Sequence, residues 1–463
     1  MQISPNIDPK AQIDILDLEN RISKFRNGEI DDERFRAFRL ARGVYGQRQQ
    51  GVQMIRIKLP YGKVTVNQLL KMAEVSDKYS TGHLHLTTRQ DVQIHYVKLE
   101  DTPLVWNDLE EARITLREAC GNTVRNVTAS ISAGVDKDEP FDVTPYTHAF
   151  FEYFLRNPIC QEMGRKFKVS FSSSEKDTAL SYIHDLGFIP KIKDGKHGFK
   201  VMIGGGLGSQ PFLAQVAHEF LPIDQLIPFS EGVIRVFDRY GERVRRHKAR
   251  MKYLISEVGL EEFLKLVEEE RAALKYKVYP IDVNKLPNGA AFVAKQLPVI
   301  EPVDKVKFEE WRKTNAIEQK QLGNYAINIR ILLGNFSTET ARKFAAIVKE
   351  VAADDIRISI NQGLMIKFIP ENGLPYVFNK LNEIGFAEPG FDSTTDITTC
   401  PGTDTCNLGI ASSYGITKVL EEMMKTEFHD LIYNNDIKIK ISGCMNSCGQ
   451  HGMANIGLHG SSI

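Results

Sequence analysis

The amino-acid sequence predicts an α+β fold made of two pseudo-symmetric copies of one module. The main observation is an internal repeat at a constant displacement of 272 residues, which aligns Gly62 with Gly334 and Gln90 with Gln362. Apolar positions follow the same displacement. The pattern of each copy predicts a strand, a glycine turn, an amphipathic helix and then two strands in which apolar and polar residues alternate. A module that occurs twice favours a molecule with a pseudo-twofold axis.

The composition is that of an ordinary globular protein. Of the 463 residues, 59 are Lys or Arg and 59 are Asp or Glu, so no excess charge favours nucleic acid or a membrane as partner. No apolar run approaches the ~18 residues of a membrane-spanning helix. The first residues lack the basic and apolar regions of a signal peptide. Six cysteines are too few for a disulfide scaffold in a chain of this length. We therefore expect a cytoplasmic protein.

The repeat also predicts how the chain is divided. The stretch RKFKVSFSSS aligns with DIKIKISGCM, so the repeat extends beyond the first strands and helix of each copy. Between the copies, YPIDVNKLPNG and QLPVIEPVD read as a connector. The predicted segments are a charged helical extension (1–43), a half-domain (44–112) and a larger domain (113–277) of the first copy, the connector (278–321), and a half-domain (322–390) and a final domain (391–463) of the second copy.

Four cysteines lie in loop-forming sequence near the end of the chain. TTCPGTDTCNLG contains Cys400 and Cys406, and SGCMNSCGQHG contains Cys444 and Cys448. Glycine, proline and small polar residues surround them, which allows several thiolates to converge on one centre. Four thiolates suit an iron–sulfur cluster or a tetrahedral zinc ion, and the wide spacing of the first pair favours the cluster. The alternative is four unrelated buried thiols.

The two remaining cysteines, Cys120 and Cys160, have no such pairing. We expect them to be small core residues, because a free cysteine is commonly buried.

Basic residues form a second set, and they lie in the first copy. Lys166 and Lys168 are two residues apart on a predicted strand, so their side chains point to one face. Arg89 and Arg125 complete the set. An ordinary solvated surface is the alternative for any one of them. At the displacement of the repeat, Ser172 faces Cys444, Asn361 faces Arg89, and Lys438 and Lys440 face the two lysines.

Two further motifs carry weaker signals. GFKVMIGGGLGSQP has Ser209 where a dinucleotide fingerprint needs its last glycine, so a tight turn or a close approach of backbone to a ligand explains it better. Three histidines, His83, His85 and His95, occur near Arg89. We expect them at the surface or in the core, with His85 as a possible ligand contact.

Seven motifs together resemble one known family. They are LTTRQDVQIH, VRNV, RKFK, GFKVMIGGGLG, RHKARMKY, TTCPGTDTCNLG and SGCMNSCG, and they resemble the sirohaem-dependent sulfite and nitrite reductases from about Gly43 onward. The resemblance implies that each copy pairs a ferredoxin-like half-domain with a mixed α/β domain that binds sirohaem and a [4Fe–4S] cluster. The family continues beyond the position at which this chain ends, so we expect the last domain to be incomplete.

The resemblance also implies roles for individual residues. Cys400, Cys406, Cys444 and Cys448 would be the cluster ligands, and Cys448 would also bridge the cluster to the sirohaem iron. Arg89, Arg125, Lys166 and Lys168 would bind the substrate anion and deliver protons. Arg89, Arg125 and Asn126 would also contact the sirohaem.

The expected reaction is the six-electron reduction of sulfite to sulfide in sulfate assimilation. Sulfite reductases tend to have Lys-x-Lys where nitrite reductases have Lys-x-Asn, and this chain has Lys166-Phe167-Lys168. The alternatives are nitrite reduction to ammonia, an iron–sulfur electron carrier without a substrate, and a structural protein with zinc bound to its cysteines. No flavin or nicotinamide domain is evident, so the electrons would come from ferredoxin or from a separate flavoprotein.

Overall fold

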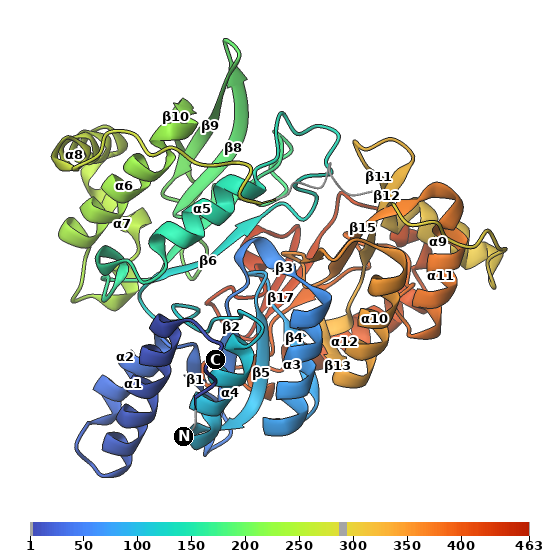
Figure 1. The fold of residues 1–463 in the computed structure, drawn as a ribbon, viewed down its shortest axis with the longest axis horizontal. Coiled ribbons are helices and arrows are strands. Elements are labelled where there is room, and N and C mark those ends of the chain that lie inside the picture. Colours follow the sequence, from blue (N-terminus) through green and yellow to red (C-terminus); the bar gives the residue numbers. More distant parts are fainter. Residues whose placement is uncertain (1–2, 287–293, 463) are drawn as a thin grey trace. The chain divides into compact units, whose positions relative to one another are not determined.

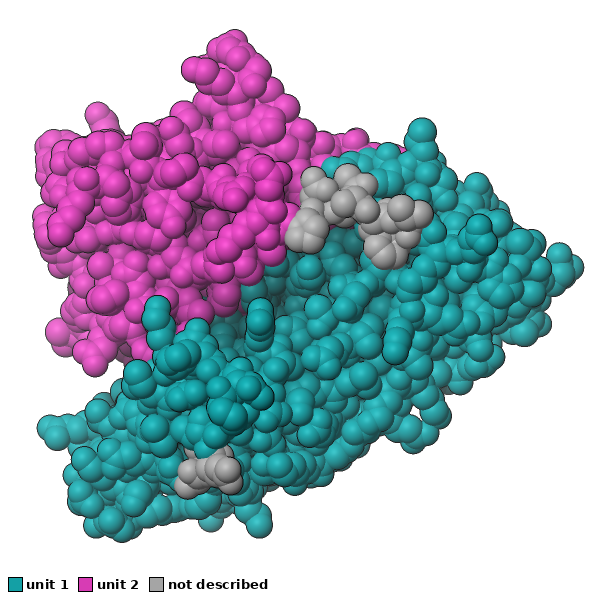
Figure 2. Space-filling view, viewed as in Figure 1, with its two compact units in different colours: residues 1–116, 292–463 teal, residues 117–291 magenta. Residues whose placement is uncertain are grey.

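The computed structural model describes residues 3–286 and 294–462. The chain forms two compact units (Figure 2). Unit 1 combines Met1–Leu116 with Phe292–Ile463, and unit 2 is the continuous segment Arg117–Ala291. Within the described ranges, no helix is both long and apolar enough to cross a membrane.

The first half-domain of unit 1 is a sheet packed against two helices. Strands β2 (Val52–Ile57), β4 (His83–Leu86) and β5 (Val92–Lys98) form its centre, with the short strand β1 (Val44–Gly46) at one edge. Helix α3 (Val66–Tyr79) packs on the sheet beside α4 (Thr102–Glu110) (Figure 1). A capping box of Thr65 and Gln68 starts α3. The charged extension before β1 forms helices α1 (Pro9–Arg26) and α2 (Asp32–Leu40), and α1 packs against α4.

The second half-domain repeats the first. Its elements are α9 (Lys305–Asn315), β11 (Ala316–Glu318), β12 (Asn324–Ile329), α10 (Thr338–Val351), β14 (Ile356–Ile358), β15 (Leu364–Pro370) and α11 (Leu374–Glu383). Helix α9 and β11 lie inside the segment 278–321, which the sequence predicts to be a connector. The repeat therefore begins further upstream than residue 322, because β11 pairs with β12 and so completes the second sheet. Part of the predicted connector, 287–293, lies outside the described residues.

The two half-domains exchange strands. Strand β13 (Asn335–Ser337), which belongs to the second copy, pairs with β4 and completes the first sheet. Strand β3 (Lys63–Val64), which belongs to the first copy, pairs with β14 and completes the second sheet. Helices α3 and α10 pack against each other, and one hydrophobic core contains residues of both copies. The prediction of an α+β fold with two pseudo-symmetric copies is confirmed.

A third sheet follows in unit 1. It consists of the parallel strands β16 (Thr398–Thr399), β17 (Ile439–Ser442) and β18 (Ile456–His459), with α12 (Ser413–Thr426) packed against β16 and β17. Helix α12 begins at the N-cap Ser412, whose hydroxyl oxygen accepts a hydrogen bond from the amide of Gly415.

Unit 2 contains a five-stranded mixed sheet. Its strands are β6 (Val124–Ala129), β7 (Phe167–Phe171), β8 (Leu186–Lys193), β9 (Lys196–Ile203) and β10 (Gln215–Pro222), and the first three are parallel. Its longer helices are α5 (Thr144–Phe154), α6 (Leu226–Tyr240), α7 (Met251–Val258) and α8 (Leu260–Ala273).

The parallel strands of the two units correspond. Val127 pairs with Val169 in unit 2, and Thr399 pairs with Ile441 in unit 1, again at the displacement of the repeat. The repeat therefore continues into the cysteine-bearing sheet. The two other cysteines, Cys120 and Cys160, are buried in unit 2, as predicted.

Candidate functional site

The sheet of β16 and β17 brings the cysteine loops together. Cys400 directly follows β16, and Cys444 lies two residues after the end of β17. Because these strands are parallel neighbours, both loops leave the sheet at the same edge. The amide of Ile410 donates a hydrogen bond of 2.7 Å to the carbonyl oxygen of Gly443, which joins the first loop to the second.

Burial and neighbouring thiols raise the pKa of two of the cysteines. Burial and the neighbouring Cys448 raise the pKa of the Cys400 thiol to about 11. Burial raises the pKa of Cys406, and Cys448 and Cys444 act in the same direction. Cys448 therefore lies near both Cys400 and Cys406, and Cys444 lies near Cys406.

Hydrogen-bond donors surround the sulfur atoms. The amide nitrogen of Gly443 lies 3.2 Å from the Cys400 Sγ, and the side-chain nitrogen of Asn446 lies 3.4 Å from the Cys444 Sγ. The hydroxyl of Ser413, in the first turn of α12, donates to the carbonyl oxygen of Cys400 at 2.5 Å, and its oxygen lies 3.8 Å from the Cys400 Sγ. Donors to sulfur stabilise thiolates, which is the form in which cysteine binds metals.

Glycines allow the cysteine loops to pack closely. A Cβ atom at Gly443 would lie 2.4 Å from the Cα of Gly402, and one at Gly409 would lie 2.6 Å from the carbonyl carbon of Gly402. No side chain fits at either position without movement of the backbone. The glycine-rich sequence around the cysteines therefore has a direct structural reason.

The cysteine loops fit the ligand set of a cluster. In a [4Fe–4S] cluster each iron has its own cysteine, so the four sulfur atoms surround the cluster. Two loops with four cysteines leave one edge of the sheet, and hydrogen-bond donors lie near the Cys400 and Cys444 sulfur atoms.

The start of the first half-domain holds the first cysteine loop. The amide of Arg48 donates to the carbonyl oxygen of Thr405 at 2.9 Å. The side-chain nitrogen of Gln49 donates to the backbone carbonyl oxygen of Asp404 at 2.7 Å. In return, the side chain of Asn407 donates to the carbonyl oxygen of Gly46 at 2.8 Å. These bonds lie on both sides of Cys406 and restrict its loop.

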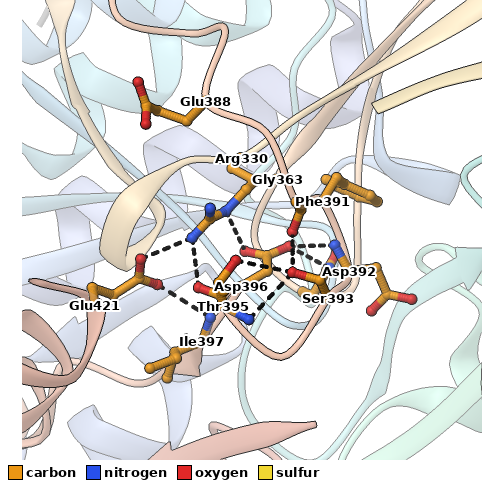
Figure 3. Close-up of polar contacts among 12 residues, drawn as sticks. Arg330, Gly363, Glu388, Phe391, Asp392, Ser393, Thr395, Asp396, Ile397 and Glu421 are labelled. Atoms are coloured by element: carbon orange, nitrogen blue, oxygen red, sulfur yellow. Dashed lines mark hydrogen bonds and ion pairs between the residues drawn. The ribbon is translucent and has the colours of Figure 1, made fainter. Parts of the chain in front are cut away.

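A partly buried ion network holds the segment before Cys400 (Figure 3). The guanidinium of Arg330 donates to Glu421 at 2.8 Å and lies 3.6 Å from Asp396. A carboxylate oxygen of Glu421 accepts the amide hydrogen of Ile397 at 3.2 Å. Burial raises the pKa of Glu421 to about 7, and the nearby Asp396 acts in the same direction, whereas Arg330 opposes it. The network therefore joins α12 to the strand that leads into Cys400.

Two equivalent turns contact the cysteine segments. The turn from Thr87 to Asp91 joins β4 to β5, and the hydroxyl of Thr88 donates to the carbonyl oxygen of Cys448 at 2.8 Å. The corresponding turn of the second copy contains Asn361, whose side chain donates to Asp396 at 3.1 Å. Each turn therefore holds one of the two cysteine segments.

The basic residues are divided between the units. Arg89 lies in unit 1, in the turn between β4 and β5. The other predicted residues of the anion site and the sirohaem contact lie in unit 2, and they are Arg125, Asn126, Lys166 and Lys168. Val124 pairs with Phe167, so Arg125 and Lys168 are on adjacent strands, and Lys166 directly precedes the second of them. The partly buried residues of this group are Arg125, Lys166 and Lys168, and Asn126 is fully buried.

Arg125 and Lys168 are held in place by groups of unit 2. The guanidinium of Arg125 donates to the carbonyl oxygens of Gly121 and Ala119, at 2.9 and 3.2 Å. The amide of Lys168 donates to Asp185 at 2.9 Å. Asp185 is fully buried and accepts two hydrogen bonds from Arg250, at 2.7 and 3.2 Å. No role for this ion pair was predicted, although Arg250 lies in the RHKARMKY motif.

The glycine cluster of the first copy packs against protein. Lys252 is buried and donates to the carbonyl oxygens of Gly206 and Leu207, at 3.3 and 3.1 Å. A Cβ atom at Gly205 would lie 2.5 Å from the carbonyl oxygen of Tyr182. Close packing of backbone therefore explains these glycines, and the predicted tight turn is present, with Gly204 at φ +84°.

The histidines near Arg89 include a buried pair. His85 and His95 form an edge-to-face contact with ring centroids 5.9 Å apart, and burial lowers the pKa of His85 to about 4 and that of His95 to about 3. The Nδ1 of His85 lies 2.8 Å from the side-chain oxygen of Asn335 and 3.2 Å from the hydroxyl of Tyr414. His85 is thus a neutral core residue, and His83 is exposed.

Comparison with known proteins agrees with the geometry. The family model for the nitrite and sulphite reductase 4Fe-4S domain matches residues 120–275. The model for the nitrite/sulfite reductase ferredoxin-like half domain matches twice, at residues 45–112 and 317–384. The two matches are separated by the displacement of the repeat. Together, the models match more than half of the chain.

Curated relatives and a solved structure point to the same family. The chain is 25% identical to sulfite reductase [ferredoxin] 1 of Mycolicibacterium paratuberculosis, over 91% of this chain and 75% of that protein. It is 27% identical to the chloroplastic ferredoxin–nitrite reductase of Oryza sativa subsp. japonica, over 89% and 66%. The structure of Mycobacterium tuberculosis NirA superposes with a TM-score of 0.81 at 25% identity, covering 97% of this chain and 82% of that one. The chain therefore belongs to the nitrite and sulfite reductase family, a family of oxidoreductases whose cofactors are sirohaem and a [4Fe–4S] cluster.

Proposed function

We propose that this protein catalyses the six-electron reduction of sulfite to sulfide in sulfate assimilation. The observation that carries the proposal is the convergence of the two cysteine loops at one edge of the sheet of β16 and β17, where the amide of Ile410 donates to the carbonyl oxygen of Gly443. We propose that Cys400, Cys406, Cys444 and Cys448 bind the cluster, and that the Cys448 thiolate bridges it to the sirohaem iron. When bound, the two cofactors supply single-electron transfer and the cleavage of sulfur–oxygen bonds.

The role proposed for the basic residues is to bind the substrate and to provide protons. Arg89, Arg125, Lys166 and Lys168 would place positive charge where the anion carries negative charge, and a preorganised cation stabilises charge that accumulates during reduction. Arg89, Arg125 and Asn126 would also contact the sirohaem. The lysine ammonium groups are the proton donors of the set, because a guanidinium keeps its proton in proteins.

Sulfite is favoured over nitrite by the residues around Phe167. Lys166 directly precedes β7 and Lys168 lies on it, and the doubly charged sulfite ion gains more from a second nearby cation than the singly charged nitrite ion does. Nitrite reduction to ammonia is the second candidate, because the similar proteins include ferredoxin–nitrite reductases of Oryza sativa and Synechococcus elongatus.

We propose a ferredoxin-type protein as the electron donor. The similar proteins named above are ferredoxin-dependent enzymes, and a separate flavoprotein is the alternative donor. Thiolate ligands need a reducing compartment, which supports a cytoplasmic location.

Steady-state turnover with reduced ferredoxin tests this proposal. Sulfide formed from sulfite and ammonia formed from nitrite are measured on the same preparation, and we expect kcat/KM for sulfite to be about tenfold or more higher. Faster formation of ammonia would make the protein a nitrite reductase. An iron-containing protein that reduces neither anion would be an electron carrier, and a preparation with one zinc and no iron would contradict the reductase assignment.

A further inference from the structure

The side chain of Gln362 connects two backbone segments that belong to different parts of the proposed site. Its oxygen accepts the amide hydrogen of Thr399 at 3.0 Å, and its nitrogen donates to the carbonyl oxygen of Leu86 at 3.0 Å. Thr399 directly precedes Cys400, and Leu86 is the last residue of β4, just before the turn that contains Arg89. One amide group therefore bridges the cysteine strand and the arginine turn.

The surroundings of Gln362 leave its amide little freedom. Only 3% of the residue is exposed, and a buried amide is costly unless it is hydrogen-bonded. Its backbone has φ +69°, which is uncommon for a residue with a side chain. A Cβ atom at Gly334 would lie 2.9 Å from the side-chain nitrogen, so the glycine provides the space that the amide occupies.

We propose that Gln362 is a positioning residue for the [4Fe–4S] site. Its two hydrogen bonds fix the end of the cysteine strand relative to the end of β4, and thus the place of Cys400 relative to the turn of Arg89. This inference rests on the proposed function, because it assumes that Cys400 binds the cluster. It concerns a residue that is not among the proposed cluster ligands or substrate-binding residues.

The internal repeat supplies a matched control residue. Gln90 is the counterpart of Gln362, is equally buried and has φ +57°. Its side-chain nitrogen donates to the carbonyl oxygen of Ile358 at 2.9 Å, which is the counterpart of Leu86. Gln90 therefore makes the reciprocal bond between the copies. A change at either glutamine disturbs the same kind of contact between the copies, and Gln362 also accepts the amide hydrogen of Thr399, the residue before Cys400.

The test compares Gln362→Met with Gln90→Met in the full-length protein purified with its cofactors. Three quantities are measured: amide hydrogen exchange at Thr399 and Cys400, the rate of iron release to a chelator, and the electron paramagnetic resonance spectrum of the reduced cluster. We expect Gln362→Met to accelerate exchange and iron release by about tenfold and to change the spectrum, because it leaves the Thr399 amide without its acceptor. Gln90→Met keeps the acceptor of the Thr399 amide, so we expect it to change hydrogen exchange at Thr399 and Cys400, and iron release, less than Gln362→Met does.

Equal effects of the two substitutions on the cluster, or no effect of Gln362→Met on iron release, would overturn the inference. If Gln362→Met does not fold, Gln362→Glu and Gln90→Glu are compared in the same way. Iron and acid-labile sulfide in the wild-type protein report separately on the proposed function. The absence of iron and sulfide would reject that function. If the cluster is present and Gln362→Met leaves its spectrum and iron release unchanged, only the positioning role is rejected.

Discussion

Thr88 donates its hydroxyl hydrogen to the carbonyl oxygen of Cys448, with 2.8 Å between the two oxygen atoms. Thr88 precedes Arg89, so one side chain ties the proposed anion-binding turn to the proposed bridging cysteine. The two residues are 360 positions apart in the sequence. The contact shows how the fold of unit 1 brings the turn of the first copy to the cysteine loop of the second.

Replacing Thr88 should loosen the loop of Cys448. Thr88→Val removes one hydrogen bond worth about 1 kcal/mol, so the amides of Cys448 and Gly449 should exchange about fivefold faster. Hydrogen exchange followed by mass spectrometry measures this. Thr88→Ser keeps the hydroxyl group and should behave like the wild type. Unchanged exchange in Thr88→Val would mean that other contacts suffice to hold the loop.

The Glu421 carboxyl should make stability depend on pH. Its pKa is raised to about 7 by burial, whereas an unfolded glutamate titrates near 4.3. A group with a raised pKa stabilises the fold fully below the unfolded value, and this contribution is lost as the pH rises through about 7. We expect the loss to be on the order of 4 kcal/mol.

Thermal unfolding between pH 4 and pH 8 tests this expectation for Glu421. Glu421→Gln cannot ionise, so the part of the pH dependence due to Glu421 should disappear. Glu422→Gln changes an exposed neighbour on the same helix and should follow the wild type. The prediction is wrong if Glu421→Gln and the wild type lose stability in parallel over this range.

The buried ion pair of unit 2 should be important for both stability and substrate binding. Asp185→Asn leaves the buried guanidinium of Arg250 without its carboxylate, which should cost roughly 3–5 kcal/mol. It also weakens the acceptor of the Lys168 amide, so KM for sulfite should rise. Chemical denaturation and steady-state kinetics measure the two effects.

The matched control for Asp185 is a surface pair in the same unit. Glu175→Gln breaks the exposed ion pair of Lys191 and Glu175 and should cost less than about 1 kcal/mol. Similar losses from the two substitutions would contradict the view that Asp185 holds a buried cation.

The choice between sulfite and nitrite should depend on Lys168. Lys168→Asn removes one proposed cation, and we expect kcat/KM for sulfite to fall by about a hundredfold, with a smaller loss for nitrite. Lys196→Asn, at an exposed position of β9, should change neither value. Equal losses for the two anions would show that Lys168 does not discriminate between them.

The repeat could be predicted because aligned residues keep one displacement over the whole chain. The exchange of β3 and β13 between the sheets could not be predicted. An alternating pattern indicates which face of a strand is buried, but it does not indicate which sheet the strand joins. Lys63 and Val64 pair with β14 of the other copy, about 290 residues away in the sequence. This pairing depends on tertiary contacts alone.

The cysteines could be predicted as metal ligands because thiols in loop-forming sequence are typical of metal and cluster sites. The residues that hold the cysteine loops in place could not be predicted. Arg330 and Glu421 are two of the 118 charged residues of the chain, and nothing in their local sequence marks them as a partly buried ion pair. The sequence shows only that Gln362 aligns with Gln90 in the repeat. Its hydrogen bond with the Thr399 amide could be seen only in the structure.

The central claim is that Cys400, Cys406, Cys444 and Cys448 hold a [4Fe–4S] cluster beside sirohaem. Iron and acid-labile sulfide per chain, measured in the wild type, Cys406→Ser and Cys160→Ala, test it most directly. We predict about five irons and about four sulfides in the wild type and in Cys160→Ala, and loss of the cluster's share in Cys406→Ser. Iron and sulfide contents in Cys406→Ser equal to those of the wild type would contradict the claim.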